Sequence, residues 1–466
     1  MIEKSHGITH TESFLAQMCD KTFLRLWSYA NPYRDDKKEL CDLLAIFDNH
    51  MFIFFDREKF IGKEILSNTS IVWNRWYRDV VVAQIKSCHG AERYIKSKRD
   101  VFINKDLKRK FPIPYDCNNI QIHKILIAHG ADEACKNISS ANINGSLAII
   151  YKGIHKNDYN IDSQTPFLVS IDRNNPVHIF DSYNFSIILS ELDTFFDFKS
   201  YIVEKERAIK KYMYFSYCGE EDLLAHYLCN FNEINNSHYI GTEKEEIDAI
   251  HIGEGEWNDF IKTPAYIAKK AADRNSYLWD KIITKTCNNA LEETLGGNSN
   301  MFSGENAIFE MAKEPRFSRR ALSDAMNNAI IKFPSNENPI IRNLTFMPSF
   351  YPGKGYVFLQ LKAPKENSYG FKYREIRKYM LEIACAAAKS KFSNLQTIIG
   401  IAVEPPRISE NLSEDFILMN CSNWDQETIE YYRKENEKEI MRFFLTDNLI
   451  MTEKNTKEFP DERLRN

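Results

Sequence analysis

Two acidic residues precede an apolar run near the start of the chain, and a cluster of mixed charge follows a second apolar run. Glu39 and Asp42 come before "LLAIF", and residues 56–59 (DREK) follow "MFIFF". Converging carboxylates are the hard oxygen ligands that hold Mg²⁺ together with several of its waters. Such an ion polarises a phosphate and lowers the pKa of an attacking water. The residue types therefore indicate phosphodiester hydrolysis; the simpler alternative is that these charges only end two strands and keep a hairpin soluble.

The pattern around these acids predicts a β-hairpin. Residues 42–47 and 51–55 read as buried strands, and the turn residues 48–50 (Asp-Asn-His) separate them. In that pairing Asp42 lies across from about residue 55 or 56. Glu39 would reach the same place from a preceding helix, one turn upstream. We therefore expect a metal site built from Glu39, Asp42 and Asp56.

A helix is predicted directly after the hairpin. Asn68 or Thr69 is a suitable N-cap, and apolar residues recur at three- and four-residue spacing from Trp73 to Ala91. Gln84 falls inside this apolar stripe. Two interpretations stay open for it: a core amide that the backbone satisfies, or a residue of the site.

Basic residues dominate the end of this helix pattern and the residues after it. Residues 86–110 contain nine Lys and Arg against three acids, although the net charge of the whole chain is −4. A local basic face suits a nucleic-acid backbone, while a solvated helix face would have a similar composition. The residues that we expect to bind nucleic acid are Lys86, Arg93, Lys96, Lys98 and Arg99.

The order of these features resembles the PD-(D/E)xK, or restriction-endonuclease-like, superfamily. More narrowly, the stretches "KELCDLLAIF", "FIFFDR" and "WNRWYRDVVVAQIKSCHGAERYI" resemble uncharacterised bacterial proteins that are discussed as nucleases of defence systems. The resemblance implies Mg²⁺ or Mn²⁺ as cofactor, with Glu39 as the helix acid and Asp42 as the metal ligand at the strand start. It further implies catalytic roles for Asp42, Asp56, Arg57, Lys59 and Gln84.

The chain departs from the superfamily pattern on the second strand. The in-register pair is Phe55-x-Arg57, but Phe cannot ligate a metal and Arg does not deprotonate to act as a base. A bulge that turned Asp56 inward would be an alternative, with Glu58 or Lys59 supplying the missing roles. Three functions therefore stay open: a metal-dependent nuclease, a degraded nuclease fold that binds nucleic acid or protein, and an interaction protein without a nucleic-acid role.

Composition and cysteine usage restrict the class of protein. Hydrophobic residues make up 43% and charged residues 27% of the 466 residues, which is typical of a globular protein. The ten cysteines form no CxxC pair, so a zinc knuckle is not indicated. With no secretory leader and no apolar run of bilayer length, we expect a cytoplasmic protein with reduced thiols. Its expected partners are nucleic acid (DNA or RNA) and a second copy or a defence-system protein, and no membrane.

The expected fold class is mixed α/β (α+β), with a restriction-endonuclease-like sheet flanked by helices at the N-terminus. The predicted divisions are a nuclease-like domain at 1–205, a mostly helical region at 206–340, a smaller α/β domain at 341–445 and a polar tail at 446–466. Residues 295–306 are the most linker-like stretch. In the last domain, strand, helix and strand patterns predict a βαβ unit.

A second candidate for an active site lies in that C-terminal domain. Gln360-x-Lys362 imitates a variant of the nuclease signature, but no Asp precedes it at matching spacing. We interpret it as strand packing with a Lys whose charged end reaches solvent.

Overall fold

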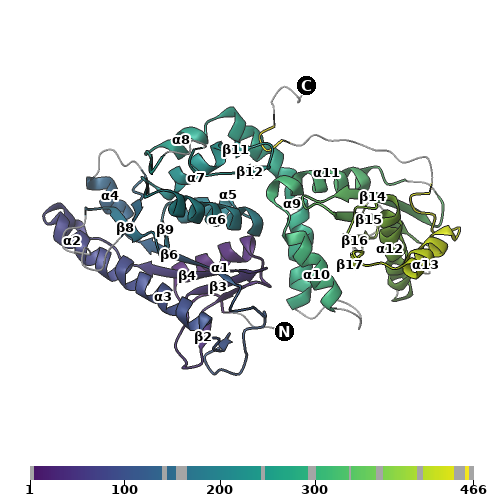
Figure 1. The fold of residues 1–466 in the computed structure, drawn as a ribbon, viewed down its shortest axis with the longest axis horizontal. Helices are drawn as coiled ribbons and strands as arrows, with labels where there is room; N and C mark the ends of the chain where they lie inside the picture. Colours follow the sequence, from purple (N-terminus) through teal and green to yellow (C-terminus); the bar gives the residue numbers. More distant parts are fainter. Residues whose placement is uncertain are drawn as a thin grey trace. The chain divides into compact units, whose positions relative to one another are not determined.

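The computed structural model describes most of the chain and divides it into two compact units. The described residues are 5–138, 144–153, 165–242, 247–291, 301–334, 337–363, 371–406, 413–445 and 457–460. The first unit comprises Ile2–Tyr266 and the second Ile267–Asn466. Both are mixed α/β, as Figure 1 shows by the arrows and coils in each. The expected fold class is confirmed at that level.

The central sheet of the first unit has five strands in the order β1-β3-β4-β6-β9. β3 (Leu43–Phe47) pairs antiparallel with β1 (Ser28–Ala30) on one side and with β4 (His50–Glu58) on the other. β6 (Gln121–His129) and β9 (His178–Asp181) continue the sheet parallel to β4. The carboxyl ends of β4, β6 and β9 therefore lie together at one edge of the sheet.

The predicted hairpin is formed by β3 and β4. Phe47 pairs with His50, so the turn has two residues, Asp48 and Asn49, and His50 belongs to the strand. Asp48 takes a left-handed conformation with φ of 55°, which two-residue hairpin turns require and Asp tolerates. All residues of β3 are buried, as the uninterrupted apolar run predicts.

Helices cover both faces of this sheet (Figure 1). On one face, Phe23 at the end of α1 (His10–Thr22) packs on Phe52 of β4 and on Phe198 of α6 (Phe195–Lys211). On the other, α3 (Ala83–Lys96) packs against β4 and β6. α3 continues α2 (Thr69–Trp76) through a π-helical segment, η2 (Tyr77–Val82). The predicted helix is thus confirmed with Asn68 at the N-cap, although the Asn68 side chain makes no capping bond.

A second, smaller sheet completes the first unit, with strand order β13-β10-β7-β8. The remaining strands are β2 (Tyr33–Arg34), β5 (Val101–Phe102), β7 (Ala148–Lys152), β8 (Leu168–Asp172), β10 (Tyr214–Tyr217), β11 (Phe231–Asn232), β12 (Ser237–His238) and β13 (Ala249–Ile252). The short helices are η1 (Lys63–Leu66), α4 (Asp132–Ile138), α5 (Asn184–Glu191), α7 (Glu220–Cys229) and α8 (Glu256–Phe260). The region that we predicted as mostly helical therefore contains strands β10 to β13 between its helices.

The sheet of the second unit has the order β14-β15-β16-β17. β14 (Ile341–Pro348) and β15 (Lys354–Lys362) form an antiparallel hairpin, and α12 (Phe371–Lys391) leads to β16 (Thr397–Val403), which is parallel to β15. The predicted βαβ unit is thereby confirmed. β17 (Glu414–Asn420) and α13 (Gln426–Glu437) follow.

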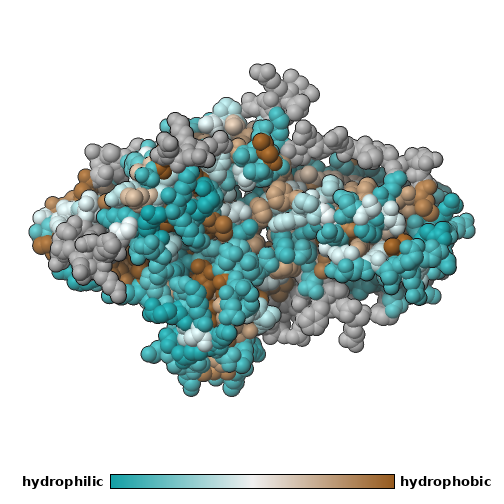
Figure 2. Space-filling model, in the orientation of Figure 1, coloured by the Kyte–Doolittle hydropathy of each residue, from teal (hydrophilic) through white to brown (hydrophobic). Residues whose placement is uncertain are grey.

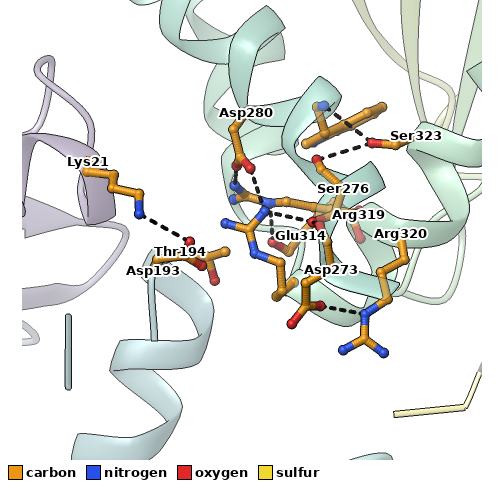
Figure 3. Close-up of polar contacts among 12 residues, drawn as sticks. Lys21, Asp193, Thr194, Asp273, Ser276, Asp280, Glu314, Arg319, Arg320 and Ser323 are labelled. Atoms are coloured by element: carbon orange, nitrogen blue, oxygen red, sulfur yellow. Dashed lines mark hydrogen bonds and ion pairs between the residues drawn. The ribbon is translucent and has the colours of Figure 1, made fainter. Parts of the chain in front are cut away.

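Ion pairs fasten the helices of the second unit to one another. α9 (Pro264–Leu291), whose first turn belongs to the first unit, packs with α10 (Met301–Ala312) and α11 (Arg316–Ile331). Figure 3 shows Arg319 of α11 directed at Asp280 of α9, and Arg320 directed at Asp273 at 2.6 Å. Because each of these arginines is almost fully buried, the pairs are structural.

Three predictions about chain organisation differ from the structure. The division between units falls at 266/267, and neither 205/206 nor 340/341 coincides with it. The second half of the expected linker, from Met301, belongs to α10, because an apolar helical pattern resumes there. The predicted polar tail at 446–466 contains one buried charged residue in its described part. This residue is Glu458, which forms ion pairs with Lys269 and Arg320.

Both units share one topological element: an antiparallel hairpin, a helical crossover, and a strand parallel to the second hairpin strand. In the first unit it is β3-β4-α2/α3-β6, and in the second β14-β15-α12-β16. Within the described ranges, no helix is long and apolar enough to cross a membrane.

Candidate functional site

Asp42 lies at the open end of the β3–β4 hairpin. Its backbone N–H donates to the carbonyl of Phe54, and its Oδ2 accepts the backbone N–H of Asp56 at 2.5 Å. The carboxylate therefore bridges the two strands at the point where the predicted pairing places residues 55 and 56 opposite Asp42. This contact orders the hairpin mouth and brings the two acids of the expected site next to each other.

Further carboxylates surround Asp42. Burial raises the pKa of Asp42 to about 7, and the negative charges of Glu12, Glu39 and Asp56 act in the same direction. Only the hydrogen bond from the Asp56 amide opposes the shift. Asn31 joins two of these acids, because its Nδ2 donates to Glu39 Oε1 at 2.5 Å and to Glu12 Oε2 at 3.2 Å. Four acids thus converge on the hairpin mouth, and their mutual repulsion favours a proton or a cation there.

Glu39 reaches this cluster differently from the prediction. It lies in an isolated β-bridge with Tyr33 instead of a helix, so its assignment as the helix acid is wrong. The acid that a helix does supply is Glu12 in the first turn of α1. The sequence carried a signal for that residue, since Thr9 and Glu12 form a capping box.

Asp56 is the most unusual residue of the site. Its side chain is only 1% exposed, and within the described residues neither carboxylate oxygen accepts a hydrogen bond. His129 Nε2 lies 3.4 Å from Asp56 Oδ1 and likewise has no hydrogen-bond partner there. A buried carboxylate without donors is unfavourable unless another group supplies the missing interaction.

The carboxyl ends of three parallel strands bring Asp56 and His129 together. Asp56 pairs with Ile127 of β6, which places His129 two residues further along the same face. His129 Nδ1 is held 3.1 Å from Ser182 Oγ, directly after β9. The sequence pattern did not identify His129, because nothing in its local spacing relates it to a residue 73 positions earlier.

The other members of the charged cluster point elsewhere. Phe55 is buried, and Arg57 and Glu58 are exposed at the end of β4. Lys59 Nζ forms an ion pair with Asp79 of η2 at 2.5 Å, and its carbonyl accepts the indole N–H of Trp76. Lys59 therefore fastens the strand end to the helix beside it.

The face of the sheet under α3 is occupied by a different polar cluster. Gln84 lies on α3 and is partly buried. Lys124 of β6 forms an ion pair with Glu92 of α3 at 2.6 Å. Burial opposes ionisation of Glu92, but hydrogen bonds from Lys124 and Lys96 hold the pKa of Glu92 below its usual value. This pair is satisfied and packs α3 onto the sheet.

The predicted nucleic-acid-binding side chains are exposed along α3 and directly after it. Lys96 pairs with Glu92, and Arg99 pairs with Asp35 while its guanidinium lies 4.7 Å from the centre of the Tyr94 ring. All five residues of this basic segment are exposed: Lys86, Arg93, Lys96, Lys98 and Arg99. Figure 2 shows that the visible surface is predominantly hydrophilic, with hydrophobic residues scattered among polar ones.

The carboxylates at the hairpin mouth fit the ligand requirements of Mg²⁺ and do not fit those of a tetrahedral zinc site. Within the described part of the chain, no three His, Cys, Asp or Glu side chains are placed to hold a metal ion together. A tetrahedral zinc site, which takes at least three protein ligands, therefore does not fit. Mg²⁺ requires only one or two carboxylates when water and substrate phosphate complete its shell, and the unpartnered oxygens of Asp56 beside Asp42 match that demand.

In comparisons with protein-family models, with curated proteins and with solved structures, nothing matched this chain.

Proposed function

We propose that this protein hydrolyses phosphodiester bonds of nucleic acid with the help of Mg²⁺ or Mn²⁺. The observation that carries the proposal is Asp56, a buried carboxylate without hydrogen-bond donors, next to Asp42, whose pKa is raised to about 7. Structural carboxylates are normally hydrogen-bonded. Carboxylates that are left without donors and pressed against other carboxylates are typical of a site that a cation completes.

Asp42 and Asp56 would hold the cation between the hairpin mouth and the substrate phosphate. When bound, the ion supplies a Lewis acid for the phosphate and lowers the pKa of a bound water. Arg57, exposed at the end of β4, offers a positive charge to the substrate, although as an arginine it cannot accept a proton. The exposed basic segment from Lys86 to Arg99 supports attraction of a polyanion.

The resemblance to nucleases of bacterial defence systems supports a role against foreign nucleic acid. The hairpin does not distinguish DNA from RNA, because phosphate and metal are common to both.

The test compares cleavage by wild type and by Asp42→Asn. Purified protein is incubated with plasmid DNA or with RNA, in Mg²⁺, in Mn²⁺ or in EDTA. We expect metal-dependent cleavage by wild type and at least about a hundredfold less by Asp42→Asn, because the metal loses a charged ligand. Glu133→Ala is the matched control, since Glu133 is an exposed acid on α4 of the same unit. Equal cleavage by wild type and Asp42→Asn would contradict the proposal.

A second candidate is a nuclease-like fold that binds nucleic acid without cutting it. Phe55, buried where the superfamily has a ligand, and the absence of a three-residue metal set among the described residues favour it. This candidate predicts salt-dependent binding of nucleic acid and no hydrolysis in any metal. Cleavage that appears only in the double variant Phe55→Glu with Arg57→Lys would support it.

A further inference from the structure

An aromatic side chain stands exposed immediately beyond the acidic site. Phe60 follows Asp56 by four residues, and its exposed fraction is 74%, which is the largest for any aromatic residue in the described chain. Exposing a phenyl ring of this size forfeits the favourable free energy of burying it. Single exposed apolar residues are common on proteins, so the position of Phe60 has to carry the argument.

The backbone beneath Phe60 is held on both sides. The N–H of Lys59 donates to the carbonyl of His129 at 3.3 Å, and the N–H of Ile61 donates to that of Gly130 at 2.9 Å. The Trp76 indole donates to the carbonyl of Lys59 at 2.7 Å. Phe60 is therefore presented on an ordered segment and not on a loose loop.

The same contacts place Phe60 beside the candidate site. A Cβ atom on Gly130 would lie 2.8 Å from Phe60 Cα, and Gly130 adopts a φ of +93°, so the two backbones touch there. The residue before Gly130 is His129, which lies against Asp56. The backbone of Phe60 thus lies against Gly130, the residue that follows His129, and His129 is the side chain that faces the buried carboxylate of Asp56.

The charges near Phe60 suit a phosphate backbone more than an apolar protein surface. Basic residues exceed acidic ones in the segments around it, 57–64 and 75–79. The basic residues are Arg57, Lys59, Lys63, Arg75 and Arg78, and the acidic ones are Glu58, Glu64 and Asp79. An aromatic face next to cations is the combination with which proteins hold unpaired bases, because the base stacks while the cations follow the phosphates.

We propose that Phe60 is a stacking platform for an unpaired base, so that the substrate of the acidic site is single-stranded nucleic acid. This inference rests on the proposed function and specifies its substrate class. A base paired within a duplex is covered on both sides by its neighbours, so only an unpaired base can place its face on the phenyl ring.

Fluorescence polarisation with labelled 20-mers in EDTA tests the proposal, because EDTA separates binding from hydrolysis. The probes are single-stranded DNA, single-stranded RNA and a duplex of the same DNA sequence. We expect Phe60→Ala to weaken binding of a single strand about fivefold or more, Phe60→Trp to retain it, and duplex binding to change less than about twofold. The DNA and RNA arms show which sugar the site accepts.

The matched control is Leu66→Ala, a truncation at an aliphatic residue that is 65% exposed in η1 close by. If Leu66→Ala weakens single-strand binding as much as Phe60→Ala, or if Phe60→Ala leaves it unchanged, the stacking role is overturned. An equal loss for duplex and single strand overturns it too. If wild type binds none of the probes, the proposed function itself fails, and this outcome differs from all the others.

Discussion

The two hairpins of this protein have the same topology but carry different polar groups near their open ends. In the first unit, the mouth of β3–β4 carries Asp42 and Asp56, which face other carboxylates and a histidine. In the second, two amides lie near the mouth of β14–β15: Asn343 pairs with Gln360 in the strand register and donates to its Oε1 at 3.1 Å.

A buried carboxylate of the second unit, Asp415, is compensated by arginines. Asp415, at the start of β17, accepts hydrogen bonds from Arg374 and from Arg377, which is itself fully buried. The comparison of Asp56 with Asp415 separates two roles of a buried carboxylate. Where a buried carboxylate is balanced by neighbours, as Asp415 is, it serves the fold; where one is left without donors, as Asp56 is, we propose that stability is given up for a site. The second unit also contains buried polar atoms without a hydrogen-bond partner among the described residues, and Gln360 Nε2 of the hairpin is one of them.

The largest expected effect comes from breaking the compensated pair. Asp415→Ala would leave the buried Arg377 guanidinium without its carboxylate, and we expect a loss of about 3–5 kcal/mol in the free energy of unfolding. Thermal unfolding measures this loss, with Glu427→Ala on α13 as the exposed control, within about 0.5 kcal/mol of wild type. A loss under 1 kcal/mol for Asp415→Ala would remove the contrast between the compensated Asp415 and Asp56.

At the first hairpin we expect a substitution to raise the free energy of unfolding instead of lowering it. Asp56→Asn removes a buried charge that has no hydrogen-bond donor, so we expect the free energy of unfolding to rise by about 1–2 kcal/mol while cleavage is lost. Unfolding is measured by chemical denaturation at pH 8. Should Asp56→Asn destabilise the protein at that pH, Asp56 would be a structural partner of His129, like Asp415 with its arginines.

The buried carboxylate of Asp42 also lowers the stability of the folded protein, and its effect depends on pH. Its pKa is about 7 in the folded chain and about 3.9 when unfolded, so between these values the native state holds a proton that the unfolded state has lost. Its contribution to stability therefore decreases as pH rises from about 4 to 7 and is constant above. We expect Asp42→Asn to remove this slope in denaturant unfolding at pH 5, 6 and 7, and parallel curves for variant and wild type would disprove the raised pKa.

The smallest effect is expected at the amides of the second hairpin. Gln360→Met keeps the volume and removes an unpartnered amide N–H₂, while Asn343 still donates to the Ala329 carbonyl at 3.2 Å. Stability should change by less than about 1 kcal/mol, and cleavage should not change. If Gln360→Met lowers cleavage in the plasmid assay, Gln360-x-Lys362 belongs to a second site and the two hairpins are functionally alike.

Local patterns in the chain determined much of the architecture. The apolar runs of β3 and β4, the turn at Asp48-Asn49 and the helix after Asn68 are all contained in fewer than a dozen consecutive residues each. Short-range contacts of side chains with the backbone are local in the same way: Asp181 Oδ1 accepts the N–H groups of Tyr183 and Asn184, and Thr194 Oγ1, at the N-cap of α6, accepts that of Asp197. Capping is a contact between near neighbours.

Only the tertiary structure decided which charges meet. Asp56 and His129 belong to different strands and are joined by parallel pairing across a long crossover, and Glu12 reaches Asp42 from a helix at the start of the chain. Lys59 is drawn to Asp79, and Glu39 lies in a bridge instead of a helix. A residue type and its spacing specify a strand or a turn, because those depend on backbone preferences and local burial. Whether a buried carboxylate is compensated depends on groups that are distant in sequence, and the proposal of a site at the first hairpin rests on that difference.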